Sequence, residues 1–172
     1  RSSRRRWFYG ALLALMIIGL ADLALAQRPY QMVYEPTVVN VGYDGRFTFA
    51  RLKYPVAPGG YYYYGMPAWA HGLPRAEDNL LQILHAITAV PVRRETSNVF
   101  ALDDPELTKY PVAYMTEAGY WQLTNREAAA FRAYLLKGGF AIFDDFRPPP
   151  RGGGGWETFE ANMRRILPEA RI

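Results

Sequence analysis

Residues 138–146 read GGFAIFDDF and decide the fold class. The two glycines follow a stretch with helical periodicity, where glycine supplies the left-handed backbone that ends a helix. Residues 140–143 form an uninterrupted apolar run, typical of a parallel strand covered on both faces. Asp144 and Asp145 come next, at the carboxyl edge where parallel sheets bind ligands. This unit predicts an α/β domain with a mainly parallel sheet.

The segments on either side continue the same pattern. Thr124-Asn125-Arg126-Glu127 is a capping box that starts the helix before the two glycines. Strands alternating with helices predict right-handed crossovers and flanking helices. The remaining predicted elements are strands at 47–54, 98–102 and 111–116, a capped turn at 103–107, a tentative edge strand at 38–41, and helices at 77–90 and 156–167.

The helix at 77–90 carries one broad apolar face that we expect to be buried. His85 lies at the edge of this face, so we expect it to be partly buried and hydrogen-bonded rather than a ligand. The residues of the apolar face are Leu80, Leu81, Ile83, Leu84 and Ile87.

The composition excludes several function classes. The chain has 172 residues and no cysteine, which rules out disulfides, thiolate metal sites and cysteine nucleophiles. Its net charge is +4, but residues 1–26 hold four arginines and one aspartate and so account for three of these charges. A nearly neutral domain without a basic stripe is not expected to bind nucleic acid.

The N-terminal segment allows two interpretations. Residues 7–21 carry no charge and follow three arginines, and ADLALAQ at 21–27 resembles a signal-peptidase site. Residues 7–26 are also about 30 Å long as a helix, enough to span a bilayer. Because the segment is present in the chain, we predict a retained signal anchor. Its predicted membrane-facing residues are Trp7, Phe8, Tyr9, Leu12, Leu13, Leu15, Ile17 and Ile18.

This anchor sets the predicted domain organisation and location. Residues 1–26 form a transmembrane helix, 27–46 an extended tether, and 47–172 the α/β domain, with an extension beyond Ile172 left open. Arginines stay on the cytoplasmic side of a membrane. We therefore predict a single-pass inner-membrane protein with a cytoplasmic N-terminus and a periplasmic domain.

Several motifs together resemble a bacterial family of uncharacterised extracytoplasmic domains. They are FARLKYP, DDPEL, YPVAYMTEAG, LTNRE and GGFAIFDDF, in this order from residue 49 onward. The family is similar to class I glutamine-amidotransferase-like, flavodoxin-like folds. The resemblance implies that fold and a bacterial extracytoplasmic setting. It implies no activity, so no catalytic residue is transferred.

No nucleophile is found where such a fold would place one. Amidotransferase-type catalysis needs a cysteine on the turn after a central strand, and the strand at 111–116 is followed by Glu117-Ala118-Gly119. Outside the N-terminal segment, Ser97 is the sole serine, and it precedes a strand. We predict no catalytic residue and no cofactor.

A cation site at the sheet edge is the alternative chemistry. Asp144 and Asp145 could hold a divalent cation with Asp103, or with Asp104 or Glu117. Adjacent side chains diverge at a strand end, however, so hydrogen bonding to loop amides is the favoured interpretation. His71 is placed for function, but one histidine is not a site.

The loop at 56–76 is the most unusual surface feature. Tyrosine is enriched at protein and membrane interfaces, where its ring is buried and its hydroxyl stays wet. We predict that this loop is an interface rather than a ligand pocket. The interface residues are Tyr61, Tyr62, Tyr63, Tyr64, Met66 and Trp69.

Together these features predict a non-catalytic, membrane-anchored periplasmic subunit that stabilises a multi-subunit membrane complex. Its partners are then other subunits of the complex, together with the bilayer around the N-terminal helix. A bacterial photosynthetic reaction-centre–light-harvesting assembly is one host that fits the setting. The alternative is a periplasmic metal-dependent hydrolase or ligand-binding domain that uses the carboxyl edge of the sheet.

Overall fold

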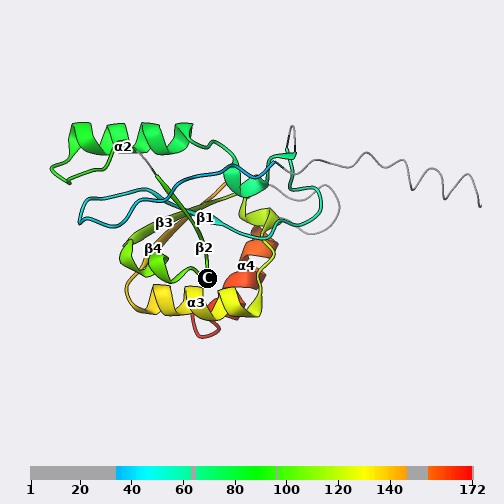
Figure 1. Cartoon of the computed structure of the whole chain (residues 1–172). Coiled ribbons are helices and arrows are strands. Elements are labelled where there is room, and N and C mark those ends of the chain that lie inside the picture. Colours follow the sequence, from blue (N-terminus) through cyan, green and yellow to red (C-terminus); the bar gives the residue numbers. More distant parts are fainter. Residues whose placement is uncertain (1–33, 63–64, 96, 147–154, 172) are drawn as a thin grey trace, which may run out of the picture. The chain divides into compact units, whose positions relative to one another are not determined.

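Four parallel strands form the sheet at the centre of the domain (Figure 1). A computed structural model describes residues 34–62, 65–95, 97–146 and 155–171. The strands are β1 (Ala50–Lys53), β2 (Asn98–Ala101), β3 (Val112–Thr116) and β4 (Phe140–Asp144), in the order β2-β1-β3-β4. Every pairing is parallel. The predicted α/β class with a parallel sheet is therefore confirmed.

Helices lie on both faces of this sheet. Figure 1 shows α2 (Arg75–Ile87) on one face, with α3 (Asn125–Leu136) and α4 (Gly155–Ile166) on the other. In the described parts of the connections lie the short 3₁₀ helices η2 (Ala68–Ala70), η3 (Pro105–Lys109) and η4 (Ala118–Tyr120). The connections β1–α2–β2 and β3–α3–β4 leave β1 and β3 in the middle of the sheet.

The turn between α3 and β4 confirms the sequence prediction in detail. Thr124 and Glu127 form the reciprocal capping box at the start of α3. Gly138 has φ +98°, the left-handed conformation that ends the helix. Gly139 serves a different purpose, because a Cβ atom there would lie 2.5 Å from the ring of Tyr134. Glycine is therefore needed at position 138 for the positive φ angle, and at position 139 for the close approach of Tyr134.

The main core lies between the sheet and the α3–α4 face. Phe143 of β4 contacts Phe159 of α4, with ring centroids 4.8 Å apart, and stacks on Trp121 at 6.1 Å. Phe131 of α3 completes this group. These aromatic contacts fix α3 and α4 against β3 and β4.

The opposite face is much less covered than the sequence predicts. Of the five apolar residues expected to be buried on α2, only Leu81 is buried. Ile83 and Ile87 are 53% and 75% exposed, and on β4 Phe140 and Ile142 are 62% and 39% exposed. The expectation of two buried faces was wrong because, among the described residues, this side carries α2 as its sole α-helix.

The outer edge of β2 is protected by the segment that precedes the sheet. Residues 38–41, the tentative edge strand, contain no strand in the structure. The side chain of Asn98 instead accepts from Val41 N at 2.9 Å and donates to Val41 O at 3.0 Å. Asn40 makes the same pair of bonds with the backbone of Val99. Two amide side chains thus replace a strand's backbone bonds on this edge.

The predicted transmembrane helix at 1–26 and residues 27–33 of the predicted tether lie outside the described residues. Among the residues that the structure does describe, no helix has the length and apolar character needed to cross a membrane.

Candidate functional site

Three chemically active side chains meet at the carboxyl edge of β3 and β4. His71 follows η2, Glu117 follows β3, and Asp145 follows β4. One ligand atom from each lies within 4.8 Å of the others. Parallel α/β sheets bind ligands outside the carboxyl ends of their strands, so the cluster has the position expected of a functional site.

Glu117 is held in place by its backbone and by its burial. Its φ and ψ angles are 56° and 42°, and its side chain has no exposed surface. The Glu117 amide donates to the carbonyl of Asp144 at 2.9 Å, which ties the end of β3 to that of β4. Left-handed conformations cost a non-glycine residue roughly 1–3 kcal/mol and concentrate at functional sites.

Asp145 shares this unusual backbone. Its φ is 55°, and Glu117 and Asp145 are the two non-glycine residues with positive φ in the described part of the chain. The Asp145 amide donates to Asp144 Oδ1 at 2.8 Å. Asp144 accepts from Tyr114, whereas Asp145 lies with His71 and Glu117, so the two aspartates do not belong to one group of ligands.

His71 reaches the cluster from a loop. Its Nδ1 lies 2.8 Å from Glu117 Oε1, and 40% of its side chain is exposed. Tyr62 stacks on the imidazole with centroids 5.1 Å apart and an interplanar angle of 27°. The His71 carbonyl accepts from Arg51 Nη1 at 3.0 Å. The ring is therefore oriented on one side by stacking and on the other by Glu117.

A buried ion pair supports the loop that carries His71. Arg51 of β1 and Glu77 of α2 are both buried and form a salt bridge. Arg51 Nη1 also donates to the carbonyl of Trp69 at 2.9 Å. A buried arginine must be neutralised and hydrogen-bonded to offset its desolvation. Because its partners are Glu77 and two loop carbonyls, Arg51 fixes η2 and the start of the following loop.

Tyr54 lies on the other side of Glu117. Its hydroxyl is 2.8 Å from the carbonyls of both Thr116 and Glu117, and it can donate to one of them at a time. Burial raises the pKa of Tyr54, and the nearby Glu117 carboxyl raises it further. The hydroxyl consequently remains a donor that holds the strained turn at Glu117.

The other predicted metal residues do not join the cluster. Asp103 forms a salt bridge with Arg126 at 2.6 Å, and Asp104 caps η3 by accepting from Glu106 N. Asp144 accepts a hydrogen bond from Tyr114 Oη at 3.0 Å. Of the three aspartates in the predicted site, only Asp145 belongs to the group with His71 and Glu117.

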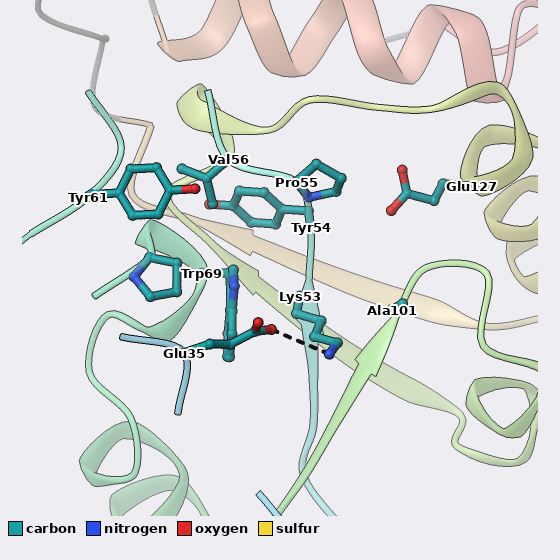
Figure 2. Close-up of a pocket in the computed structure, with 10 residues that line it drawn as sticks. Glu35, Lys53, Tyr54, Pro55, Val56, Tyr61, Trp69, Ala101 and Glu127 are labelled. Atoms are coloured by element: carbon teal, nitrogen blue, oxygen red, sulfur yellow. Dashed lines mark hydrogen bonds and ion pairs between the residues drawn. The ribbon is translucent and has the colours of Figure 1, made fainter. Parts of the chain in front are cut away.

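The aromatic loop faces inward more than predicted. Trp69 is 3% exposed and Met66 packs against the core, so both serve packing. Tyr63 and Tyr64 lie outside the described residues. Tyr61 lines a pocket of about 330 Å³ at the carboxyl ends of β1 and β2, next to Tyr54 and Trp69 (Figure 2).

This pocket is distinct from the cluster of His71, Glu117 and Asp145. Its lining includes Lys53 and Glu35, whose charged groups are 3.5 Å apart. The dashed line in Figure 2 marks this pair. Both side chains are about half exposed, and such surface pairs contribute little. None of His71, Glu117 and Asp145 lines the pocket. The connection between the two is Tyr54, which lines the pocket and whose hydroxyl holds the turn at Glu117.

The sequence suggested Glu117 and Asp145 because both directly follow parallel strands, whose carboxyl ends share one edge. It could not place His71 beside them. That contact depends on how the loop at 56–76 folds back over the sheet, and this fold depends on the buried Arg51–Glu77 pair.

A comparison with protein families matches residues 48–172 to the family described as "Domain of unknown function (DUF4159)". No curated protein matches the chain.

Proposed function

The chain belongs to the DUF4159 family, a domain of unknown function, and we propose that it is a non-catalytic docking subunit of a membrane complex. The observation that carries this proposal is the half-covered sheet face beside α2. The bound partner is an amphipathic helix of a neighbouring subunit, which completes that face.

The site chemistry favours a non-catalytic role. The turn after β3 holds Glu117, whose carboxylate is buried and hydrogen-bonded to His71, in place of an exposed nucleophile. Ser97 is buried just before β2, at the amino end of the sheet and away from the carboxyl edge. Among the described residues, neither a serine nor a cysteine lies at this edge to act as a nucleophile.

We also propose a relationship to the flavodoxin-like, amidotransferase-like folds. The order β2-β1-β3-β4 agrees with the first four strands of the flavodoxin-like order 2-1-3-4-5. In this comparison Glu117, with its left-handed backbone after a central strand, occupies the place of the amidotransferase nucleophile. The scaffold is then one whose reactive position holds a buried carboxylate.

The dimensions of the sheet show what is missing on its α2 face. Neighbouring strands are about 4.8 Å apart, so four strands span about 14 Å between their outer members. A helix is about 10 Å wide and covers roughly two strands. Two helices, α3 and α4, cover one face, whereas α2 lies alone on the other in the described chain (Figure 1). The gap has the width of one helix.

The side chains of α2 indicate where that helix belongs. Its polar flank, with Asp78, Gln82 and His85, lines a hollow together with Arg94 and Glu95 from the segment leading to β2. His85 is therefore exposed on this polar flank, and the expectation that it is partly buried was wrong. Because this hollow lies on the side of α2 that leads to β2, we infer that the opposite flank of α2 faces the β3–β4 half of the sheet.

That opposite flank is apolar. It carries Ile83 and Ile87, and the neighbouring half of the sheet exposes Phe140 and Ile142. We call these four side chains the docking residues. Large exposed apolar side chains on the same side of a soluble domain are typical of interaction sites. A partner helix with an apolar stripe would bury all four side chains, and it would need no charged residue at the contact.

The sequence supplies the membrane setting of the proposal. An anchor at residues 1–26 would keep the domain beside other membrane subunits. Because Asn40 and Val41 pack on β2, the part of the tether before them has 13 residues and reaches at most about 47 Å. A reaction-centre–light-harvesting assembly is the first host to test. The intact mass of natively purified protein tests the anchor, since a chain that starts at Gln27 contradicts it.

Photocrosslinking in native membranes tests the docking proposal. A photoreactive phenylalanine analogue replaces Phe140 in the full chain, and the matched control carries it in place of the exposed Gln82 on the polar flank. We expect the probe at Phe140 to crosslink to the apolar stripe of a helix in a different subunit. The probe at Gln82 is expected to give no such product, and peptide mass spectrometry identifies each one.

Two results would contradict the proposal. One is a probe at Phe140 that crosslinks only to a second copy of this chain or to lipid. The other is a Phe140→Asp chain that remains folded, with an unchanged circular dichroism spectrum, and still co-purifies with the complex at the wild-type ratio. Phe140 is more than half exposed, so this substitution is not expected to unfold the domain.

A further inference from the structure

We propose that His71, Glu117 and Asp145 bind one divalent transition-metal ion of the Zn²⁺ class. The ligands are His71 Nδ1 and one carboxylate oxygen from each acidic residue. The proposal is independent of docking, because these three residues lie at the carboxyl edge and the docking residues lie on the α2 face and β4.

The three ligands converge from segments far apart in the sequence. His71 comes from the loop after η2, whereas Glu117 and Asp145 terminate two adjacent strands. Their backbone is fixed on both sides of the cluster. The Glu117 amide bonds to Asp144 O at 2.9 Å, and the His71 carbonyl is held by Arg51. Convergence on a rigid support is what a metal site requires of its ligands.

The ligand types select the class of ion. Mg²⁺ and Ca²⁺ prefer sets made wholly of oxygen, whereas an imidazole nitrogen with carboxylate oxygens suits Zn²⁺ and related ions. The chain has no cysteine, so softer thiolate sites are excluded. Three protein ligands leave one or more positions for water. The partial exposure of His71 gives an ion access to the cluster.

The distances are close to those of a bound ion. Ligand atoms about 2.1 Å from a tetrahedral Zn²⁺ lie about 3.4 Å from each other. The three atoms here lie within 4.8 Å of one another, and His71 Nδ1 is 2.8 Å from Glu117 Oε1. An ion therefore has to part His71 and Glu117 by about 0.6 Å. A small rotation of the His71 side chain can supply this movement without moving the backbone, since the imidazole is partly exposed.

The charges around the cluster favour a cation. Glu117 and Asp145 are two carboxyls beside a single imidazole, and Asp144 adds a third carboxyl next in the chain. Arg51, the buried cation of β1 beneath the loop that carries His71, is neutralised by its salt bridge to Glu77. Buried carboxylates are stabilised by pairing or by metal coordination. A divalent ion supplies that stabilisation and connects the aromatic loop to the ends of β3 and β4.

Zinc binding by the full chain in detergent tests the site. The protein carries an affinity tag without histidine, and the bound metal is counted by mass spectrometry after dialysis against a Zn²⁺ buffer. We expect one ion per chain and a rise in the melting temperature with Zn²⁺. His71→Ala is expected to lose the ion, and Glu117→Gln, which keeps the shape of the side chain, is expected to bind at least tenfold more weakly.

His85 provides the matched control because it is the only other histidine in the chain. It lies on α2 near Asp78 and Glu95, so it is an exposed histidine with nearby carboxylates. His85→Ala is expected to bind Zn²⁺ as the wild type does. The proposal is overturned if His71→Ala keeps the ion, if His85→Ala loses it, or if the wild type binds none. Melting curves without metal confirm that each variant is folded.

Discussion

At the scale of single residues, Tyr134 connects the end of α3 to the beginning of two strands. It is 3% exposed, and its hydroxyl donates to the carbonyl of Tyr110 at 3.0 Å, just before β3. Its ring also occupies the space that a side chain at Gly139 would need. One phenol thus determines both a hydrogen bond and the choice of glycine at the start of β4.

The titration of Tyr134 gives a testable consequence. Burial raises its pKa from about 10 to about 12, so the unfolded chain loses this proton first as the pH rises. The stability due to the neutral phenol is complete below pH 10 and is lost between about pH 10 and 12. Urea unfolding at pH 9 and pH 11 should show a larger loss of unfolding free energy for the wild type than for Tyr134→Phe.

The same experiment contains its own check. At pH 9 we expect Tyr134→Phe to be less stable by about 1 kcal/mol, because it lacks one buried hydrogen bond. Tyr54 and Tyr114 also have raised pKa values through burial, so both proteins weaken at high pH. Equal losses in the two proteins would show that Tyr134 does not titrate differently in the folded state.

At the scale of elements, the two edges of the sheet are treated differently. The β2 edge is closed by the side chains of Asn40 and Asn98, whereas β4 has no strand partner on its outer side among the described residues. Exposed strand edges invite pairing with other chains, and proteins usually cover them. The cover on β2 leaves β4 as the side of the sheet that is open to a partner.

The side-chain contacts of Asn98 and Asn40 at the β2 edge lead to a prediction about stability. Asn98 is fully buried and bonds to both backbone groups of Val41. Asn98→Ala should lower the unfolding free energy by about 1–3 kcal/mol, because it leaves polar groups without partners. Hydrogen exchange at residues 38–43 should become faster. Asn40→Ala is the control, with a smaller expected loss because Asn40 is exposed.

Helices and strands that are determined by neighbouring residues could be predicted from the sequence. What packs against these elements could not. The capping box at Thr124 and the left-handed Gly138 depend on neighbouring residues, and both were confirmed. The apolar strand at 140–143 was placed correctly, but its second buried face was not. The pattern of apolar and polar residues indicates which side chains should be buried. It does not indicate whether this chain or a partner buries them.

The same distinction applies to the carboxyl-edge cluster. Glu117 and Asp145 follow strands, so the parallel topology alone brings them to one edge. His71 joins them through Arg51 of β1 and through Tyr62 of its own loop. A contact that needs three segments has no signature within any one of them.

At the scale of the whole molecule, the domain has one complete layer of helices and one incomplete layer. Hydrogen exchange can compare the full chain isolated in detergent with the same chain in its native assembly. In the isolated chain, α2 is expected to open easily, because Leu81 is its one buried apolar residue. In the assembly, a helix packed on the docking residues should slow exchange in α2 and β4 at least tenfold.

Helix α3 supplies the internal reference for this measurement. It already packs within the complete layer through Phe131, so its exchange should be equal in the two samples. Protection confined to the loop around Tyr61 and Tyr62, with α2 and β4 unchanged, would place the contact at the aromatic loop and contradict docking on the α2 face. Slower exchange in α2, β4 and α3 alike would indicate general stabilisation. Only protection of α2 and β4 without α3 fits a helix that completes the sheet.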